Sequence, residues 1–596
     1  MTAPVQITYV VSSLETNTHR VHFRMEVRGV HDPSFDLLLP VWAPGAYEIL
    51  ESSREVRELT ARRLGGTSEL PVERREKNRW KVTTLGADAV EVRYTVYAHD
   101  AGDDAIDLSE EHLFLNAPRC LPWVAGREKE PVELVLNLPP AWKAYAELPR
   151  TGENPPRFQA RDYEELVDTP VDCGTPVELT VRPAGIPHRI LFCGGPGNYE
   201  EHRVEADVTK IVEAQVKFFG GSPLPAYTFF VHLADRRDGG LEHKFSTSLV
   251  VERNSFRPPE EYDRFLTLVS HEYFHLYNVK RIRPRVLGPF DFTRENYTHL
   301  LWWMEGTTDY AALLLVRRCG LFSPAKFLTK VAELAQRYLL TPGRAVRSLE
   351  EASFTAWVDL YRAYEETRNQ SVSYYLKGLL VSMCLDLEIR SRTENRVGLD
   401  QVFRTLWKEY GEPGRGLEEG ELFTVIQRVS GLDLTEFFDR YVRGTAELDL
   451  DAFARYAGLS FGPAPKPGGP NEPTEPAYLG IETTNDGGRV RVREVLDGTP
   501  ARRAGVTPGD EVIALDGTRV MFDGFLDALK RFSPGEEVNV DLFRRGVLKR
   551  VKVVVGKTPP AKFAFTPVTN PTDLQRKVYA AWLDATWEAP SPNPPT

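Results

Sequence analysis

One segment constrains this 596-residue chain more than any other, the run His271-Glu272-Tyr273-Phe274-His275. It lies in an apolar stretch that follows two prolines, residues tolerated at the start of a helix. Positions four residues apart share one face of a helix, so His271 and His275 can direct both imidazoles at one metal ion. Glu272 projects beside them, where a carboxylate can take a proton from a metal-bound water. The alternative is a pair of unrelated histidines on a helix surface.

A second apolar helix is expected to supply the remaining ligand, because catalytic zinc takes three protein ligands and keeps one position for water. This helix begins near Trp302 and carries Glu305 and Asp309, again four residues apart. Buried carboxylates are costly unless they are paired or bind a metal. We therefore expect Glu305 to be the third ligand of one Zn²⁺ per chain, and Asp309 to orient a ligating histidine. The alternatives are a solvent-facing Asp309 and a third ligand supplied by His299.

The combination of H-E-x-x-H with W-x-x-E-G on a second helix resembles the gluzincin metallopeptidases. The longer run H-E-Y-F-H-L-Y-N-V-K-R-I-R-P at 271–284 is similar to the glycyl aminopeptidase family, whose members often carry a PDZ domain. The run L-P-V-W-A-P-G-A-Y at 39–47 is similar to the N-terminal signature of that family. The resemblance implies a thermolysin-like catalytic domain and a zinc aminopeptidase that releases small N-terminal residues, glycine or alanine.

A glycine-rich segment follows an expected strand at 227–233. The run Gly239-Gly240-Leu241-Glu242-His243 resembles the G-x-M-E-N strand of the aminopeptidase N family, with histidine in place of asparagine. By this resemblance Glu242 binds the free α-amine of the substrate. Gly239 and Gly240 would let the backbone approach the ligand closely. The alternative is a hairpin turn that carries Glu242 on the surface.

A tyrosine segment is expected near the metal. The run Tyr375-Leu376-Lys377-Gly378 resembles the Y-x-K-G segment of aminopeptidase N relatives, whose tyrosine supports the oxyanion. A phenol beside the scissile carbonyl can donate a hydrogen bond as negative charge develops there. The resemblance assigns this role to Tyr375. The adjacent Tyr374 is a competitor, and aromatic packing within a helix is the alternative for both.

The composition is that of a globular protein, with 42% hydrophobic and 27% charged residues. It contains no apolar stretch long enough for a membrane helix. A net charge of −11 argues against nucleic acids and anionic membranes as partners. The five cysteines are dispersed and form no C-x-x-C pair, which favours a reducing compartment. Since no signal peptide is visible at the N-terminus, we expect a cytoplasmic protein.

The pattern of residues predicts a multidomain α+β chain. Apolar and polar residues alternate over 1–185, which predicts an N-terminal antiparallel β domain. Helical periods dominate the expected catalytic domain at 186–460. A Pro/Gly-rich linker is expected at 461–476, because such a composition cannot pack or pair regularly. The tail at 558–596 is expected to contain one short helix.

Residues 477–557 resemble a bacterial PDZ domain, through Y-L-G-I at 478–481 and P-G-D-E-V-I at 508–513. The loop formed by Tyr478, Leu479, Gly480 and Ile481 would present backbone N–H groups to the C-terminal carboxylate of a peptide. The alternative is a module that only packs against its own catalytic domain.

Three functions fit these patterns. The first is a zinc aminopeptidase acting on peptides with a free N-terminus. The second is a zinc endopeptidase with the same metal site. This hypothesis is favoured if Glu242 faces away from the cleft. The third is a non-catalytic adaptor that binds peptides through its PDZ domain. Retention of both histidines, Glu272 and Glu305 argues against the adaptor.

Overall fold

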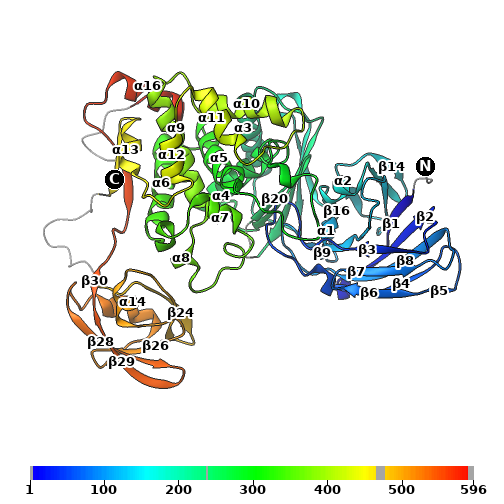
Figure 1. Cartoon of the computed structure of the whole chain (residues 1–596), viewed down its shortest axis with the longest axis horizontal. Coiled ribbons are helices and arrows are strands. Elements are labelled where there is room, and N and C mark those ends of the chain that lie inside the picture. Colours follow the sequence, from blue (N-terminus) through cyan, green and yellow to red (C-terminus); the bar gives the residue numbers. More distant parts are fainter. Residues whose placement is uncertain (1–4, 236–238, 465–476, 588–596) are drawn as a thin grey trace. The chain divides into compact units, whose positions relative to one another are not determined.

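The computed structural model describes residues 5–235, 239–464 and 477–587 (Figure 1). The chain forms two compact units. The first contains Met1–Thr298, Ala311–Leu321 and Val402–Val425, and the second contains His299–Tyr310, Phe322–Gln401 and Ile426–Thr596. Among the described residues, no helix has the length and apolar character needed to cross a membrane.

The first unit opens with β-sheet, as the alternating sequence predicts. An eight-stranded sheet has the order β14 (Arg150–Glu153), β15 (Pro156–Ala160), β12 (Val132–Leu136), β1 (Gln6–Glu15), β2 (Arg20–Arg28), β8 (Ala89–Tyr97), β4 (Val56–Arg63) and β5 (Glu69–Leu70). Along β2 every second side chain is buried, including Val21, Phe23 and Met25. The sheet is antiparallel except where β1 pairs in parallel with β12.

Two smaller sheets complete the N-terminal part. One has the order β13 (Lys143–Tyr145), β16 (Val171–Gly174), β10 (His112–Leu115) and β9 (Ile106–Leu108). The other has the order β11 (Trp123–Val124), β3 (Ser34–Leu38), β7 (Arg79–Thr83) and β6 (Val72–Glu76). Two short helices lie between these strands in sequence, α1 (Ala117–Cys120) and α2 (Tyr163–Val167).

A five-stranded sheet follows in the same unit. Its order is β17 (Val177–Val181), β18 (His188–Cys193), β19 (Tyr227–Ala234), β21 (Ser246–Glu252) and β20 (Gly239–Glu242). The three central strands are parallel and both edge strands are antiparallel to their neighbours. Helix α4 (Pro259–Phe274) packs on β20, β21 and helix α3 (Glu201–Phe219). The strand and the helix expected to carry the chemistry are therefore in direct contact.

The second unit is built around the buried helix α9 (Tyr374–Arg392). Its packing partners are η5 (Trp302–Gly306), α6 (Pro324–Leu339), α7 (Leu349–Phe354), α13 (Leu450–Arg455) and α16 (Asp573–Leu583). Further helices of this unit are α8 (Thr367–Gln370) and α12 (Thr435–Tyr441). Three helices have residues in both units, α5 (Thr307–Arg318), α10 (Leu399–Leu406) and α11 (Glu421–Ser430).

The PDZ part of the second unit has a hydrophobic core of its own, which includes Val490, Val512 and Val540. Its sheet has the order β24 (Ile481–Asp486), β25 (Arg489–Val495), β26 (Glu511–Leu515), β28 (Glu537–Arg544) and β29 (Val547–Val554), and β27 (Thr518–Arg519) pairs with β26. Strand β23 (Ala477–Tyr478) pairs with β30 (Gly556–Lys557), and the two helices are α14 (Pro500–Ala504) and α15 (Phe525–Leu529).

The structure differs from the sequence prediction where the linker was expected to begin. Residues 461–463 end strand β22 (Leu459–Pro463), which pairs with β31 (Phe563–Pro567) beyond the PDZ domain. The aromatic rings of Phe461 and Phe563 stack with their centroids 5.5 Å apart, a contact between distant residues that composition does not reveal. The remainder of the expected linker, 465–476, lies outside the described residues, as do residues 588–596 of the tail.

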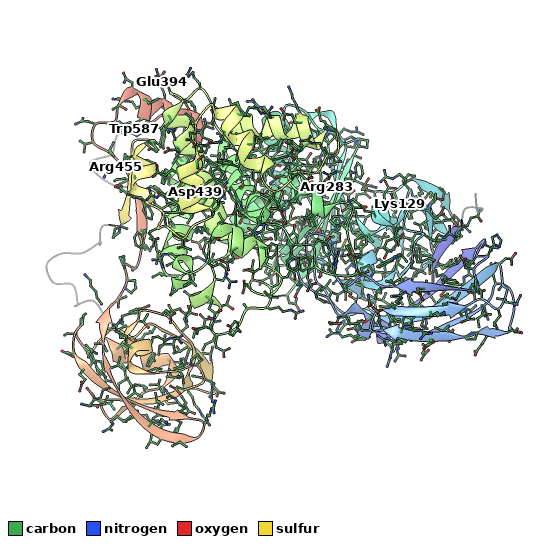
Figure 2. The ribbon with its side chains drawn as sticks, in the orientation of Figure 1. Lys129, Arg283, Glu394, Asp439, Arg455 and Trp587 are labelled. Carbon is green, nitrogen blue, oxygen red and sulfur yellow. The ribbon has the colours of Figure 1, made fainter. Side chains whose placement is uncertain are left out.

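The tail returns to the helical part of the second unit, where Figure 1 shows α16 at the red end of the colour bar. Trp582 of α16 is fully buried, and its indole N–H donates to the Tyr310 hydroxyl at 2.9 Å. Gln575 donates to the backbone carbonyl of Arg455 at 2.6 Å, close to Trp587. Arg455 and Trp587 are labelled in Figure 2. The predicted short helix is thus part of the core rather than an appendage.

A buried lysine in α9 gives a testable effect of pH on stability. The Lys377 side chain is fully buried and its Nζ has no hydrogen-bond partner among the described residues. Burial lowers the pKa of Lys377 to about 8. Between pH 8 and about 10.5 the unfolded chain therefore holds a proton that the folded chain has released, so this group makes stability rise with pH. Below pH 8 its charge costs up to roughly 3 kcal/mol.

We expect Lys377→Met to unfold at a higher temperature than the wild type at pH 7, and the difference to shrink as pH rises toward 10.5. Thermal unfolding followed by circular dichroism at several pH values measures this. The matched control is Lys217→Met, which removes an exposed lysine of α3. A constant difference between Lys377→Met and wild type across this pH range would contradict the assignment.

Candidate active site

The paired histidines lie at the end of α4. The helix ends at Phe274, and His275 is its C-cap residue, whose N–H donates to the carbonyl of His271 at 3.2 Å. The Nε2 atoms of His271 and His275 are 2.8 Å apart. His275 Nδ1 donates to the carbonyl of Asn278 at 2.7 Å, so the neutral imidazole keeps its lone pair on Nε2. Two imidazole nitrogens that face one another can bind a shared cation once they separate to the roughly 3.3 Å of a tetrahedral zinc site.

Buried polar contacts fix the rotation of α4. The Gln215 amide of α3 is fully buried and donates to the Ser270 carbonyl at 2.7 Å and to its hydroxyl at 3.0 Å. The Ser270 hydroxyl in turn donates to the carbonyl of Ala312 at 3.0 Å. Because satisfied buried hydrogen bonds are costly to break, they hold the histidine-bearing face of α4 in one orientation.

Glu305 belongs to η5, a π-helical segment that leads into α5. Such segments occur frequently at functional sites. Glu305 is 2% exposed. His271, His275 and Glu305 each offer one ligand atom, and these atoms all lie within 4.8 Å of one another. Two imidazoles and one carboxylate are a donor set that suits catalytic zinc.

The alternatives for the third ligand and the orienting acid can be placed as well. His299 is exposed and stacks on the ring of Phe354, with the centroids 4.6 Å apart. This arrangement gives no support to His299 as a ligand. Asp309 lies in the first turn of α5 and is half-buried. Its burial therefore does not decide between an acid that orients a ligating histidine and a solvent-facing residue.

Two glycines bring the expected tyrosine segment to Glu305. A Cβ added to Gly306 would lie 2.6 Å from the Cα of Gly378, and a Cβ added to Gly378 would lie 2.8 Å from the carbonyl oxygen of Trp302. Only residues without a side chain allow the backbones of η5 and α9 to approach so closely. The W-x-x-E-G and Y-x-K-G runs are thus two sides of one helix contact.

The two adjacent tyrosines differ in burial. Tyr374 is fully buried, whereas Tyr375 is partly exposed. The Tyr361 hydroxyl lies 3.2 Å from the hydroxyls of both. Burial, and then the neighbouring Glu305 carboxylate, raise the pKa of Tyr375 well above its ordinary value. The phenol therefore keeps the proton that a hydrogen-bond donor needs.

Glu242 lies inside the protein rather than on a surface hairpin. It is 4% exposed at the end of β20, which pairs with β21. Glu242, Glu272 and His275 each present an atom within 4.8 Å of the others. A Cβ on Gly240 would collide with the Glu272 carboxylate, so the glycine gives that carboxylate its space. Gly239 lies in the same strand, against Asp103.

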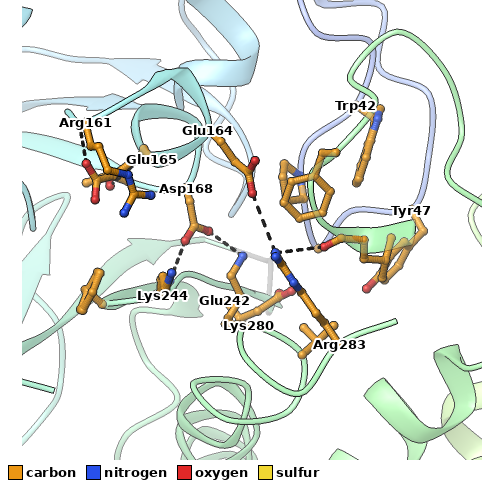
Figure 3. Close-up of a pocket in the computed structure, with 17 residues that line it drawn as sticks. Trp42, Tyr47, Arg161, Glu164, Glu165, Asp168, Glu242, Lys244, Lys280 and Arg283 are labelled. Atoms are coloured by element: carbon orange, nitrogen blue, oxygen red, sulfur yellow. Dashed lines mark hydrogen bonds and ion pairs between the residues drawn. The ribbon is translucent and has the colours of Figure 1, made fainter. Parts of the chain in front are cut away.

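Glu242 also lines a pocket formed with the N-terminal part of the chain (Figure 3). Trp42 and Tyr47 lie on one side of it, and both come from the L-P-V-W-A-P-G-A-Y run. Gly45 of the same run has φ +99°, and a Cβ there would lie 2.6 Å from the Glu242 carboxylate. The N-terminal run therefore builds one wall beside the proposed amine-binding acid.

His243 occupies the position that is asparagine in the G-x-M-E-N strand of the aminopeptidase N family. Its Nδ1 lies 3.7 Å from the carboxylate of Asp168, which Lys280 approaches at 2.5 Å. Burial would raise the pKa of Asp168, but Lys280 and His243 outweigh burial and hold that pKa below its usual range. Asp168 and Lys280 line the pocket; Lys280 belongs to the run at 271–284, whereas no local pattern points to Asp168.

Comparison with known proteins relates three regions of the chain to known families. The model of the M61 glycyl aminopeptidase matches residues 264–381, that of the peptidase M61 N-terminal domain matches 8–175, and that of the PDZ domain matches 477–555. A crystal structure described as an aminopeptidase N family protein from Idiomarina loihiensis is similar, with 27% sequence identity and a TM-score of 0.89. That likeness covers 97% of this chain and 100% of the other. The comparison with curated proteins gave no match.

Fold, site and comparisons together define a metallopeptidase, a hydrolase of multidomain α+β architecture. Residues 264–381 match the M61 glycyl aminopeptidase, residues 8–175 match the N-terminal domain of that peptidase family, and residues 477–555 match a PDZ domain. The family and the fold class predicted from the sequence are confirmed.

Proposed function

We propose that the protein is a zinc-dependent aminopeptidase that releases small N-terminal residues, glycine or alanine, from peptides. The observation that carries the proposal is the position of Glu242 within 4.8 Å of Glu272 and His275. A buried carboxylate that is neither the general base nor a zinc ligand can pair with a cationic group of the substrate. The ammonium group of a peptide's free N-terminus supplies one, and an internal peptide bond does not.

The residues have separate tasks in this proposal. His271, His275 and Glu305 hold one Zn²⁺, which when bound acidifies a water and polarises the scissile carbonyl. Glu272 accepts the proton of the water on its carboxylate and then delivers it to the leaving amine. Asp309 orients a ligating histidine.

The substrate is held by the remaining groups. Glu242 pairs with the α-ammonium, and Gly239 and Gly240 let the strand lie close to the substrate backbone. Tyr375 donates its hydroxyl hydrogen to the carbonyl oxygen as negative charge develops on that atom. Peptides with a free N-terminus are thus the partners of the catalytic site.

Substrate preference is tested with aminoacyl anilides that differ only in the N-terminal side chain. We expect kcat/KM to be highest for glycine and alanine and lower for leucine and phenylalanine. Zinc measured by mass spectrometry on the same protein links activity to the metal. A higher kcat/KM for the large residues would contradict the proposed preference, while leaving the aminopeptidase activity itself intact.

Replacing Tyr375 with phenylalanine is expected to lower kcat by about 10²-fold and to change KM little, because its hydrogen bond strengthens only in the transition state. Steady-state kinetics on one glycyl substrate measures both constants. Tyr374→Phe is the matched control, since it removes the hydroxyl of the adjacent, fully buried tyrosine. The opposite ranking of the two variants would transfer the role to Tyr374.

We propose that the PDZ domain binds a peptide C-terminus through the loop Tyr478, Leu479, Gly480 and Ile481, beside the edge strand β24. The same domain also packs on α8. Arg368 of α8 pairs with Glu482 and Glu494 of the PDZ domain, and the Asn369 amide donates to the carbonyl of Val495 at 2.9 Å. Arg502 of α14 also pairs with Glu366, so α8 and the residues before it contact several parts of the domain.

Excising the PDZ domain should leave the chemistry largely unchanged. Ala464 donates its N–H to the carbonyl of Lys562 at 2.9 Å, so a two-residue Asn-Gly turn can replace 465–561 and keep β22 paired with β31. We expect this variant to bind zinc and to hydrolyse a dipeptide-sized substrate within about tenfold of wild type, roughly 1.4 kcal/mol in barrier height.

The comparison variant ends at Gly462 and therefore lacks β31 and α16 as well. It should unfold at a much lower temperature, since the core then loses Trp582. A PDZ-excised protein that is folded and zinc-loaded but inactive would show that the domain helps to build the active site.

A further inference from the structure

We propose that the first unit holds a second zinc ion, bound by His112, Asp172, Cys193 and His232. The four residues come from four strands, β10, β16, β18 and β19. All four are buried, with exposed fractions of 7%, 0%, 3% and 6%. None of them takes part in the proposed peptidase chemistry, so the site is separate from the catalytic one.

The geometry of the group suits a tetrahedral zinc ion. Each residue offers one ligand atom, and these atoms lie within 4.8 Å of one another. His112 Nδ1 and His232 Nε2 both face Asp172 Oδ2, at 3.5 and 3.1 Å. Bonds of about 2.0–2.3 Å at tetrahedral angles separate neighbouring ligand atoms by roughly 3.3–3.7 Å. Small side-chain adjustments are therefore enough to receive the ion.

A carboxylate outside the group orients one of the ligands. Asp107 of β9 lies 3.1 Å from His112 Nε2, on the side of the ring away from Asp172. A proton held on Nε2 by Asp107 leaves the lone pair of the neutral imidazole on Nδ1. Carboxylate–histidine pairs of this kind commonly support zinc ligands.

Unsatisfied atoms in the group also indicate a missing partner. His112 Nδ1 and Asp172 Oδ1 are buried and have no hydrogen-bond partner among the described residues. Buried polar atoms in native proteins nearly always have one. Four protein ligands would leave no open position for water, which is typical of a structural rather than a catalytic zinc.

The ion would join two separate sheets. His112 and Asp172 lie in the small sheet with β13 and β9, whereas Cys193 and His232 lie in the five-stranded sheet. The latter sheet ends in β20, the strand that carries Glu242. A hollow of about 370 Å³, lined in part by Asp107, His112 and His232, provides a route from the surface. Metal binding should therefore stabilise the first unit without adding a catalytic group.

The first test is the zinc content of the full-length protein. After removal of loosely bound metal we expect two zinc ions per chain in the wild type, and one in His271→Ala and in Cys193→Ser. The two variants separate the sites, because the first loses the catalytic ion and the second loses the proposed one. One zinc in the wild type and none in His271→Ala would overturn the second site and leave the peptidase proposal standing.

The second test identifies the thiolate ligand. In protein reconstituted with Co²⁺, Cys193 should produce a thiolate-to-cobalt charge-transfer band in the near ultraviolet, since the catalytic ligands include no sulfur. Cys193→Ser should lose the band, whereas Cys319→Ser, which alters a half-buried cysteine in another part of the chain, should keep it. Should Cys193→Ser fail to fold, the spectrum of His271→Ala decides, because this variant keeps only the sulfur-containing site. Cobalt bound without the band in that protein would refute the proposal.

Discussion

Replacing Glu272 with glutamine is expected to lower kcat by about 10²–10⁴-fold while the metal stays bound. The amide has the shape of the carboxylate and fits the space left by Gly240, but it cannot accept a proton. The histidine ligands are unchanged. Steady-state kinetics together with zinc analysis on the same preparation measures both effects.

The matched control for this substitution is Glu261→Gln, in the first turn of the same helix. It removes one carboxylate from α4 far from the histidine pair and should have wild-type activity. Full activity in Glu272→Gln would remove Glu272 from its role as base. Loss of zinc in that variant would mean that the side chain supports the metal site instead.

Replacing Glu242 with glutamine is expected to raise KM for substrates with a free amine by about 10–100-fold, because a charge-assisted hydrogen bond contributes roughly 1.5–3 kcal/mol. Activity toward N-acetylated peptides should stay at its low wild-type level, so the gap between the two substrate classes narrows. The measurement is kcat/KM for a glycyl peptide and its acetylated counterpart, in wild type and variant.

The matched control here is Glu252→Gln, which removes an exposed carboxylate at the end of β21, the neighbouring strand. It should leave both substrate classes unaffected. An unchanged KM in Glu242→Gln would show that another group binds the ammonium, and would favour the endopeptidase alternative.

The parts of the fold that follow from local periodicity could be predicted from the sequence. The alternation in β2 reflects one buried and one open face of a sheet, and the spacing of His271 and His275 reflects one turn of a helix. Both patterns need only neighbouring residues. Glu272 and Glu305 were predicted for a similar reason, since their spacing needs only nearby residues, whereas Glu242 was predicted from a resemblance to a family strand.

Other parts depend on contacts between distant residues and could not be predicted. The π-helical turn that carries Glu305 packs closely through Gly306 on Gly378, more than seventy positions away. The return of the tail depends on the pairing of β22 with β31, across the whole PDZ domain. The group around Asp172 is drawn from four strands with no common spacing, so no motif could have revealed it.

The most direct test of the account is the ratio of two rates in the wild-type protein. One substrate is a glycyl peptide with a free N-terminus, and the other is the same peptide with an N-acetyl group. With zinc bound, we predict that the free peptide is cleaved after its first residue and that the acetylated peptide is cleaved at least about tenfold more slowly, a difference of roughly 1.4 kcal/mol. Equal cleavage of the two, or cleavage at internal bonds, would contradict the account and make the protein an endopeptidase.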